Sequence, residues 1–180
     1  ECAGGPRAFK YGTTRRYVLA LEAVLPTGEV IHTGGKSVKN VVGYDLTQLL
    51  VGSEGTLAIM TEVTLRLIPK PPARATVLAA FRSVDDAVRA VGGILADRVV
   101  PAARELIDRD CVDAIMTATG KRVGAANAGA LLLVECDGIP EAVHEEIDRV
   151  VHACTRHGAL DVDRARDDTA RDELWTVRRD

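Results

Sequence analysis

The spacing of hydrophobic and polar positions changes once along the chain, near residue 70. Before that point, short aliphatic runs alternate with turns that contain glycine, as in "YVLALEAVLPTGEVIHTGG". Pro26 presets φ for the first position of the turn inside this stretch, and Gly28 accepts the positive φ that follows. The pattern therefore predicts that residues 1–70 form β-strands joined by tight turns.

The longest alternating stretch follows Gly55. One side of it is mostly apolar and consists of Leu57, Ile59, Thr61, Val63, Leu65 and Leu67. A period of two predicts a strand with this side packed on a core. A short helix is expected before it, with Asp45 as N-cap and Gln48 reaching back to complete a capping box. Gly52 is expected to end that helix.

Residues 69–75, "PKPPARA", interrupt this periodicity. Three prolines within four residues favour a stiff, extended connection. We therefore expect a domain boundary here, with one domain at residues 1–70, a linker at 71–75 and a second domain at 76–180.

Strands and helices alternate after the linker. Strands are predicted at "ATVLAAF", "PAARELID", "GALLLVECDG" and "ALDVDR", with a short helix over 111–116 and a last helix from Asp167. The helix capped by Ser83 is expected to bury a stripe of Val84, Ala87, Val88, Val91, Ile94 and Leu95. Strand, helix, strand, strand, helix, strand is the order of the ferredoxin-like, split βαβ fold. The predicted class is α+β.

Composition and charge exclude several classes of function. A net charge of -3 without a basic cluster argues against nucleic acid as a partner. No apolar run reaches the roughly 20 residues that span a bilayer. The cysteines and histidines lie far apart, without metal-ligand spacing. We therefore expect free thiols, no metal site and a cytoplasmic protein.

Both ends of the sequence indicate an internal piece of a longer protein. The first residues, "ECAGGP", contain neither an initiator Met nor a signal sequence, and "LWTVRRD" stops within a helical pattern.

Three segments of the first half are rich in glycine: "AGGPRAFKYG", "TGGKSVKNVVGYD" and "VGSEGTLAI". Each has a simple explanation as a turn, because glycine accepts positive φ without steric cost. The alternative is that main-chain groups at these turns contact a planar, phosphorylated ligand, since oriented amides bind anions. Neither the dinucleotide fingerprint nor the P-loop pattern is present.

The order and spacing of "AGGPR", "KYG", "LPTGEVI", "GGK", "GYDLT" and "GSEGTL" resemble the second half of the FAD-binding domain in the vanillyl-alcohol oxidase/p-cresol methylhydroxylase superfamily. Within it, the chain is most similar to the FAD-linked subunit of glycolate oxidase and to D-lactate and D-2-hydroxyglutarate dehydrogenases. The resemblance covers nearly all of residues 1–70 and extends more loosely through "ALLLVECDG" and "LWTVRRD". It implies the C-terminal half of a p-cresol methylhydroxylase-type FAD-binding domain, followed by the start of a ferredoxin-like α/β cap domain.

The resemblance also implies site residues. Cofactor contacts, largely through the main chain, are expected at Ala3, Gly4, Gly5, Ser53, Glu54, Gly55, Thr56, Leu57, Ala58, Ile59 and Met60. The arginine of the "LW..R" pattern maps onto Arg178 and is expected to bind the substrate carboxylate. The alternative, that Arg178 is an ordinary surface arginine of a charge-rich helix, has equal weight. Ala58 stands where the family usually has glycine, and Cys2 where it often has asparagine. The family's first phosphate loop and its expected base or metal ligands fall outside this chain, so no catalytic residue is assigned.

The implied activity is oxidation of a small 2-hydroxy acid, of glycolate or D-lactate type, to the 2-oxo acid, with hydride transfer to FAD. Oxygen, a quinone, a cytochrome or an iron–sulfur partner subunit are the electron acceptors left open. The isolated 180 residues are expected to retain little FAD. Two alternatives stand beside this interpretation: a ferredoxin-like sensing or interaction module without catalysis, and an NADPH-dependent flavin reductase of cell-wall precursor synthesis.

Overall fold

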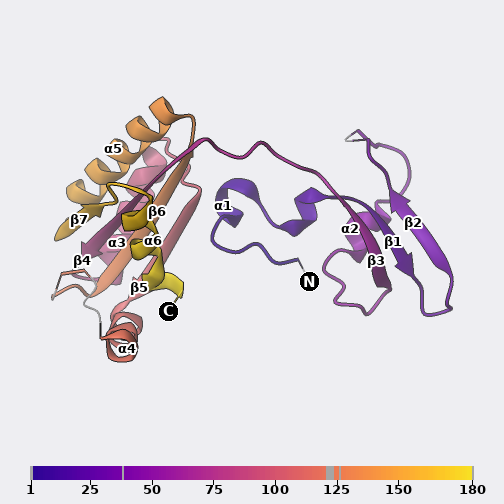
Figure 1. The fold of residues 1–180 in the computed structure, drawn as a ribbon, viewed down its shortest axis with the longest axis horizontal. Coiled ribbons are helices and arrows are strands. Elements are labelled where there is room, and N and C mark those ends of the chain that lie inside the picture. Colours follow the sequence, from indigo (N-terminus) through magenta and orange to yellow (C-terminus); the bar gives the residue numbers. More distant parts are fainter. Residues whose placement is uncertain (1, 38, 121–123, 126, 180) are drawn as a thin grey trace. The chain divides into compact units, whose positions relative to one another are not determined.

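The computed structural model describes residues 2–37, 39–120, 124, 125 and 127–179 (Figure 1). The chain divides into two compact units, Glu1–Lys70 and Pro71–Asp180. Within the described residues, none of the helices combines the length and the hydrophobicity that crossing a membrane requires.

The first unit is built on a small antiparallel sheet. Its elements are helix α1 (Ala8–Tyr11), a 3₁₀ turn (Thr14–Tyr17), strands β1 (Val18–Val24) and β2 (Val30–Gly34), helix α2 (Leu46–Leu50) and strand β3 (Ile59–Leu65). The strand order is β2-β1-β3. Gly28 has φ of +86° in the turn between β1 and β2, and its N–H donates to the carbonyl of Leu25 at 2.9 Å. The predicted hairpin turn is therefore confirmed.

Helix α2 covers one face of this sheet. Asp45 caps it as predicted, because its Oδ1 accepts the main-chain N–H of Gln48 at 2.9 Å. The capping box is not formed, since Nε2 of Gln48 donates instead to the carbonyl of Val18 at 3.3 Å and so ties the helix to β1. The core beneath α2 contains Val18, Leu21, Ala23, Leu50, Val51 and Ala58.

The apolar positions of β3 do not share one face, contrary to the prediction from their spacing. Ile59 pairs with Val24 of β1, whereas Val63 pairs with Leu21. Val24 and Leu21 are three residues apart and point to opposite faces. The register shifts between Glu22 and Ala23 of β1, which leaves Thr61 of β3 as the extra residue of a β-bulge. Ile59 is therefore 68% exposed instead of lying in the core. The other aliphatic residues of the predicted core side are exposed as well: Leu57, Val63, Leu65 and Leu67.

The second unit has the ferredoxin-like order of elements. These are β4 (Ala73–Phe81), α3 (Val84–Ala96), β5 (Ala103–Asp108), α4 (Arg109–Thr119), β6 (Ala130–Gly138), α5 (Pro140–Arg156), β7 (Asp161–Arg164) and α6 (Asp168–Arg179). The strand order is β5-β6-β4-β7, with every neighbouring pair antiparallel. Strand β4 begins at Ala73, which pairs with Gly138 of β6, so residues 73–75 of the predicted linker belong to the sheet.

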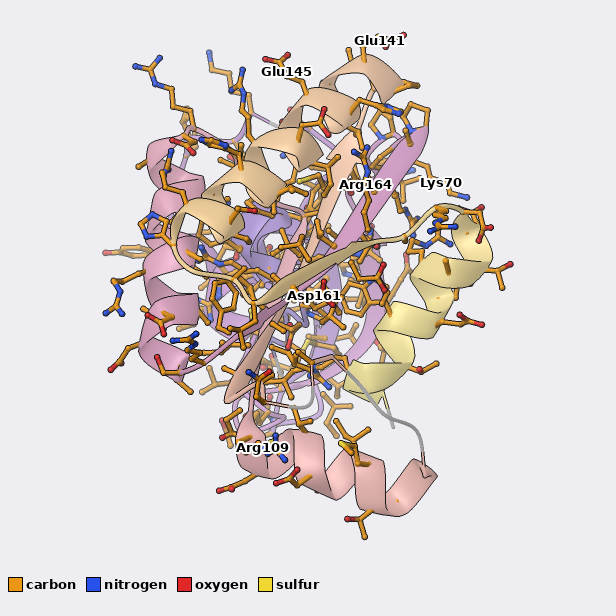
Figure 2. All side chains as sticks on the ribbon, turned by 90° about the vertical axis from the view of Figure 1, so that its left-hand side faces the viewer. Lys70, Arg109, Glu141, Glu145, Asp161 and Arg164 are labelled. Atoms are coloured by element: carbon orange, nitrogen blue, oxygen red, sulfur yellow. The ribbon has the colours of Figure 1, made fainter. Side chains whose placement is uncertain are left out.

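Helices cover both faces of this sheet. Helices α3 and α5 pack on the face that carries Val77, Phe81 and Leu132. Helices α4 and α6 pack on the opposite face, against Leu78, Leu131 and Leu133. Figure 2 shows Glu141 and Glu145 pointing outward from α5, away from the sheet.

The buried stripe of α3 differs from the predicted one. Its buried residues are Ala87, Ala90, Gly93 and Ile94, whereas Val84, Val88 and Leu95 are exposed. Small side chains allow the helix to approach its neighbours closely, and a Cβ on Gly93 would lie only 2.6 Å from Nε2 of His157. Close packing therefore decides which side of α3 faces inward, in preference to side-chain hydrophobicity.

Candidate functional site

The segment between α2 and β3 forms a tight corner. Gly52, Glu54 and Gly55 have φ of +90°, +53° and +77°. Glycine adopts this left-handed region freely, but for Glu54 it costs of order 1 kcal/mol. Both glycines are thus required by the turn itself, as the simple explanation predicts.

Hydrogen bonds within the chain hold the corner closed. The N–H of Ser53 donates to the carbonyl of Leu50 at 3.0 Å, and the carbonyl of Ser53 accepts the N–H and Oγ1 of Thr56 at 3.0 and 2.6 Å. The corner is therefore a defined main-chain shape ahead of β3.

Side chains beyond the corner separate into outer and inner sets. Leu57 and Ile59 are exposed, whereas Ala58 is buried in the core and Met60 packs against it. The methyl group of Ala58 points into the core, so it does not add to the outer surface of the corner.

The segment Ala3–Gly5 makes the second predicted contact. A Cβ on Gly4 would lie 2.7 Å from Cβ of Ala8, so local packing requires glycine there. Gly5 has φ of +61°, and a Cβ added to it would meet no atom within 4 Å in the described part of the chain. The carbonyl of Ala3 accepts the N–H and Oγ1 of Thr14 at 3.1 and 2.6 Å.

The corner lies close to Cys2, the residue that precedes the segment Ala3–Gly5. A Cβ on Gly52 would lie 3.4 Å from Cβ of Cys2 and 3.1 Å from Nη2 of Arg15. The same nitrogen of Arg15 donates to the carbonyl of Val51 at 2.7 Å. A hydrogen bond with Thr13 lowers the pKa of the Cys2 thiol, because it stabilises the thiolate.

Two observations fit an external ligand at this corner. Oγ of Ser53 is buried and has no hydrogen-bond partner among the described residues, although buried hydroxyl groups are normally paired. A Cβ added at Gly5 or Gly55 would meet no atom of the described residues within 4 Å, so these residues leave the main chain open to close approach at both glycines. The residues present therefore fit a nucleotide cofactor held largely by main-chain groups.

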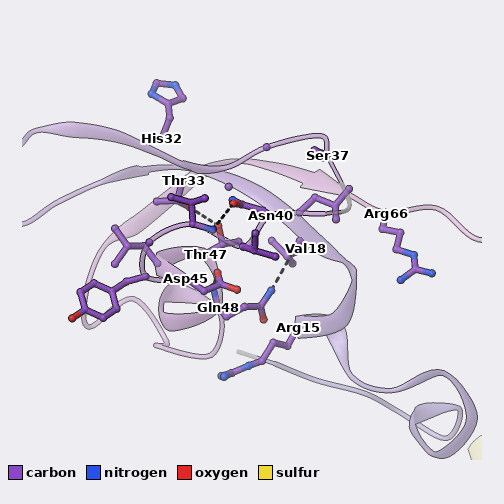
Figure 3. Close-up of a pocket in the computed structure, with 18 of the residues that line it drawn as sticks. Arg15, Val18, His32, Thr33, Ser37, Asn40, Asp45, Thr47, Gln48 and Arg66 are labelled. Atoms are coloured by element: carbon purple, nitrogen blue, oxygen red, sulfur yellow. Dashed lines mark hydrogen bonds between the residues drawn. The ribbon is translucent and has the colours of Figure 1, made fainter.

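A separate cavity of about 690 Å³ opens beside α2 (Figure 3). Its polar lining includes Arg15, Arg16, Thr33, Asn40, Gln48 and Arg66. None of the predicted cofactor residues lines it, although Arg15 joins it to the Gly52 corner. The glycine-rich stretch "TGGKSVKNVVGYD" contributes many of the lining residues, and it is the sequence feature from which this cavity could have been predicted.

Arg178 lies in the second unit, on α6. Its Nε donates to Oε2 of Glu105 at 2.8 Å, and no bond to its terminal nitrogens is found among the described residues. Arg171 on the same helix is already occupied, since its Nη1 pairs with Asp168 and its Nε and Nη2 with Asp172 at 3.3 and 3.0 Å. Of these two arginines, Arg178 is therefore the one able to receive a second carboxylate.

No group of three His, Cys, Asp or Glu side chains in the described part of the chain is arranged to hold a metal ion.

Comparison with known proteins gives close relatives over nearly the whole chain. Residues 70–180 match the family described as FAD linked oxidases, C-terminal domain. The chain is 40% identical over 180 residues to the glycolate oxidase subunit GlcD of Bacillus subtilis (strain 168), covering 99% of this chain and 38% of that protein. It is 40% identical over 176 residues to D-lactate dehydrogenase of Archaeoglobus fulgidus, covering 98% of this chain and 38% of that protein. The chain thus spans about 38% of the length of both relatives.

Solved structures with the same fold are more distant in sequence. Alkyldihydroxyacetonephosphate synthase is 21% identical with a TM-score of 0.73, covering 98% of this chain and 35% of that one. The 4-ethylphenol oxidase from Gulosibacter chungangensis is 17% identical with a TM-score of 0.61, covering 91% of this chain and 37% of that one. At these identities the similarity establishes the fold alone.

Proposed function

The chain belongs to the family of FAD linked oxidases, whose C-terminal domain it matches over residues 70–180, and we propose that it is part of a longer flavoenzyme that oxidises a small 2-hydroxy acid to the 2-oxo acid. The observation that carries this proposal is the 40% identity, across nearly the whole chain, to a glycolate oxidase subunit and to a D-lactate dehydrogenase. Residues 1–70 are then the second part of the FAD-binding domain, and the second unit, Pro71–Asp180, is the start of the cap.

The corner at Gly52–Met60 and the segment Ala3–Gly5 are the proposed cofactor contacts. Bound FAD would supply the acceptor for the substrate hydride. The protein positions the cofactor: Gly5 and Gly55 leave room for main-chain contact, and Oγ of Ser53 gains the hydrogen-bond partner that it lacks among the described residues.

Arg178 is the proposed site for the substrate carboxylate. An arginine with free terminal nitrogens binds a carboxylate through two parallel N–H···O bonds, which fix the orientation of the substrate as well as its position. Arg171, on the same helix, is bonded to Asp168 and Asp172, which supports the choice of Arg178 over Arg171. A separate electron-transfer subunit is a further proposed partner, because GlcD is named as one subunit of its enzyme.

A flavin spectrum of the full-length protein tests the proposal. The purified protein should be yellow, and anaerobic addition of glycolate, D-lactate or D-2-hydroxyglutarate should bleach the flavin. The 180-residue chain alone should lose flavin on gel filtration. A folded but colourless full-length protein would rule out the flavoenzyme and favour the ferredoxin-like sensing module.

A further inference from the structure

Helix α6 is fixed to the sheet by both apolar and polar contacts. Leu174 and Trp175 pack against the cluster that contains Leu131 and Leu133 of β6. The indole Nε1 of Trp175 donates to Oε2 of Glu135 at 2.9 Å. Arg178 follows Trp175 by three residues and so lies on the same side of the helix. The backbone that carries Arg178 is therefore held against this face of the sheet.

Glu105 meets Arg178 from the sheet. It lies on β5 and pairs with Leu133 of β6, two residues before Glu135, so all three side chains occupy one face. Its side chain is 21% exposed, whereas that of Arg178 is 49% exposed. The more buried partner is thus the carboxyl group, and the arginine extends from it toward solvent.

The bond between them uses only one edge of the guanidinium group. Oε2 of Glu105 accepts from Nε at 2.8 Å. The terminal nitrogens Nη1 and Nη2 lie at the other end of the same rigid plane, where they can meet a carboxylate bidentately. A bond to Nε therefore restricts the rotation of the side chain without occupying the end that binds a ligand.

We propose that Glu105 is a positioning residue for Arg178: it holds Nε so that Nη1 and Nη2 are presented to the carboxylate of the substrate. This inference rests on the proposed role of Arg178. An arginine fixed before the ligand arrives loses less side-chain entropy on binding, so the contact improves affinity. One guanidinium group can attract two carboxylates at once, as that of Arg171 does with Asp168 and Asp172.

Binding of oxalate to the full-length holoenzyme tests the proposal. Oxalate carries carboxylates and no α-hydrogen, so its affinity can be measured by calorimetry without turnover. Glu105→Ala should weaken oxalate binding about 10-fold, the scale of one hydrogen bond to a charged group. The same variant should raise KM for the hydroxy acid by a similar factor and leave kcat within about twofold, because Glu105 touches neither the reacting carbon nor the flavin.

Two further variants and a control keep the test decisive. Glu105→Gln retains the shape and an acceptor oxygen, so it should fold normally and weaken oxalate binding by about threefold. In an Arg178→Ala background, Glu105→Ala should have no further effect on oxalate binding, since residues acting through one another are non-additive. Glu145→Gln is the control: it breaks an exposed ion pair with Arg149 on α5, on the opposite face of the sheet, and should change nothing.

The outcomes separate this inference from the proposed function. Unchanged oxalate affinity in Glu105→Ala and Glu105→Gln, with weakened affinity in Arg178→Ala, would overturn the positioning role alone. Tighter binding in the Glu105 variants would also overturn it, because Glu105 would then compete with the ligand. Unchanged affinity in Arg178→Ala would overturn the substrate role of Arg178, and the inference with it.

Discussion

The indole Nε1 of Trp175 lies 2.9 Å from Oε2 of Glu135, a side chain that is only 1% exposed. Thr76 of the neighbouring strand donates to the same oxygen at 3.3 Å. A carboxyl group that water cannot reach must be satisfied within the protein. This contact therefore joins the last helix to the sheet through a group that is costly to leave unpaired.

Trp175→Phe should lower the free energy of unfolding of the chain by about 1–3 kcal/mol, because it keeps an aromatic ring but removes a donor to a buried acceptor. Urea titration followed by circular dichroism measures the change. Tyr44→Phe is the control, since its hydroxyl belongs to a residue that is 96% exposed, and it should stay within about 0.5 kcal/mol. Equal effects of the two changes would contradict the structural role of the bond.

The two sides of α3 should respond differently to truncation. Ile94→Ala removes a buried side chain of the main core and should cost about 2–4 kcal/mol. Val88 lies on the exposed side of the helix and is 53% exposed, so Val88→Ala should cost no more than about 0.5 kcal/mol. Thermal or urea unfolding of both variants measures the change in the free energy of unfolding. A large loss of stability in Val88→Ala would contradict the structure and support the buried stripe that the sequence predicts.

The order of strands and helices in the second unit was predictable because it depends on local periodicity and local caps, such as Ser83 at the start of α3. The faces that these elements bury were less predictable from the sequence. The bulge at Thr61 reverses the alternation within β3, and no residue pattern marks it. In α3, Ala90 and Gly93 face inward through close packing, which depends on the shape of neighbouring elements.

For the site, family resemblance supplied residue positions and the fold supplied their surroundings. Glu105 and Arg178 are 73 residues apart, and their contact depends on where β5 lies in the sheet and on how α6 packs over it. Neither is encoded in a local stretch of sequence. The Ser53 hydroxyl, which has no partner among the residues described, is likewise a property of the closed corner, since any serine in a turn looks the same in sequence.

The thiols should react with iodoacetamide in the order Cys2, Cys111, Cys154 at pH 8. The hydrogen bond with Thr13 lowers the pKa of Cys2, so more thiolate is present at that pH. Asp108 raises the pKa of Cys111, and burial raises the pKa of Cys154 to about 11. Peptide mass spectrometry after timed quenching gives the order, and early modification of Cys154 in the folded chain would contradict it.

Ser53→Ala should have opposite effects on folding and on cofactor binding. The Ser53 hydroxyl is buried and has no hydrogen-bond partner in the part of the chain that the structure describes, so its removal should leave the 180-residue chain unchanged or stabilise it by up to about 1 kcal/mol. In the full-length protein the same change should weaken FAD binding by about 5- to 10-fold. Thr56→Val is the control: it removes a hydrogen bond inside the corner and should destabilise the chain itself.

Gly55→Ala should weaken FAD binding in the full-length protein more than Gly28→Ala does. Both glycines have positive φ, +77° and +86°, and a Cβ on either meets no atom of the described residues within 4 Å. The two variants should therefore lose similar stability, about 1 kcal/mol, from backbone strain. Only the Cβ at position 55 would enter the space proposed for the cofactor. The dissociation constant of the Gly55→Ala variant for FAD should therefore rise at least about 10-fold. Fluorescence titration of the deflavinated protein measures this, and equal affinities in the two variants would remove the corner from the cofactor site.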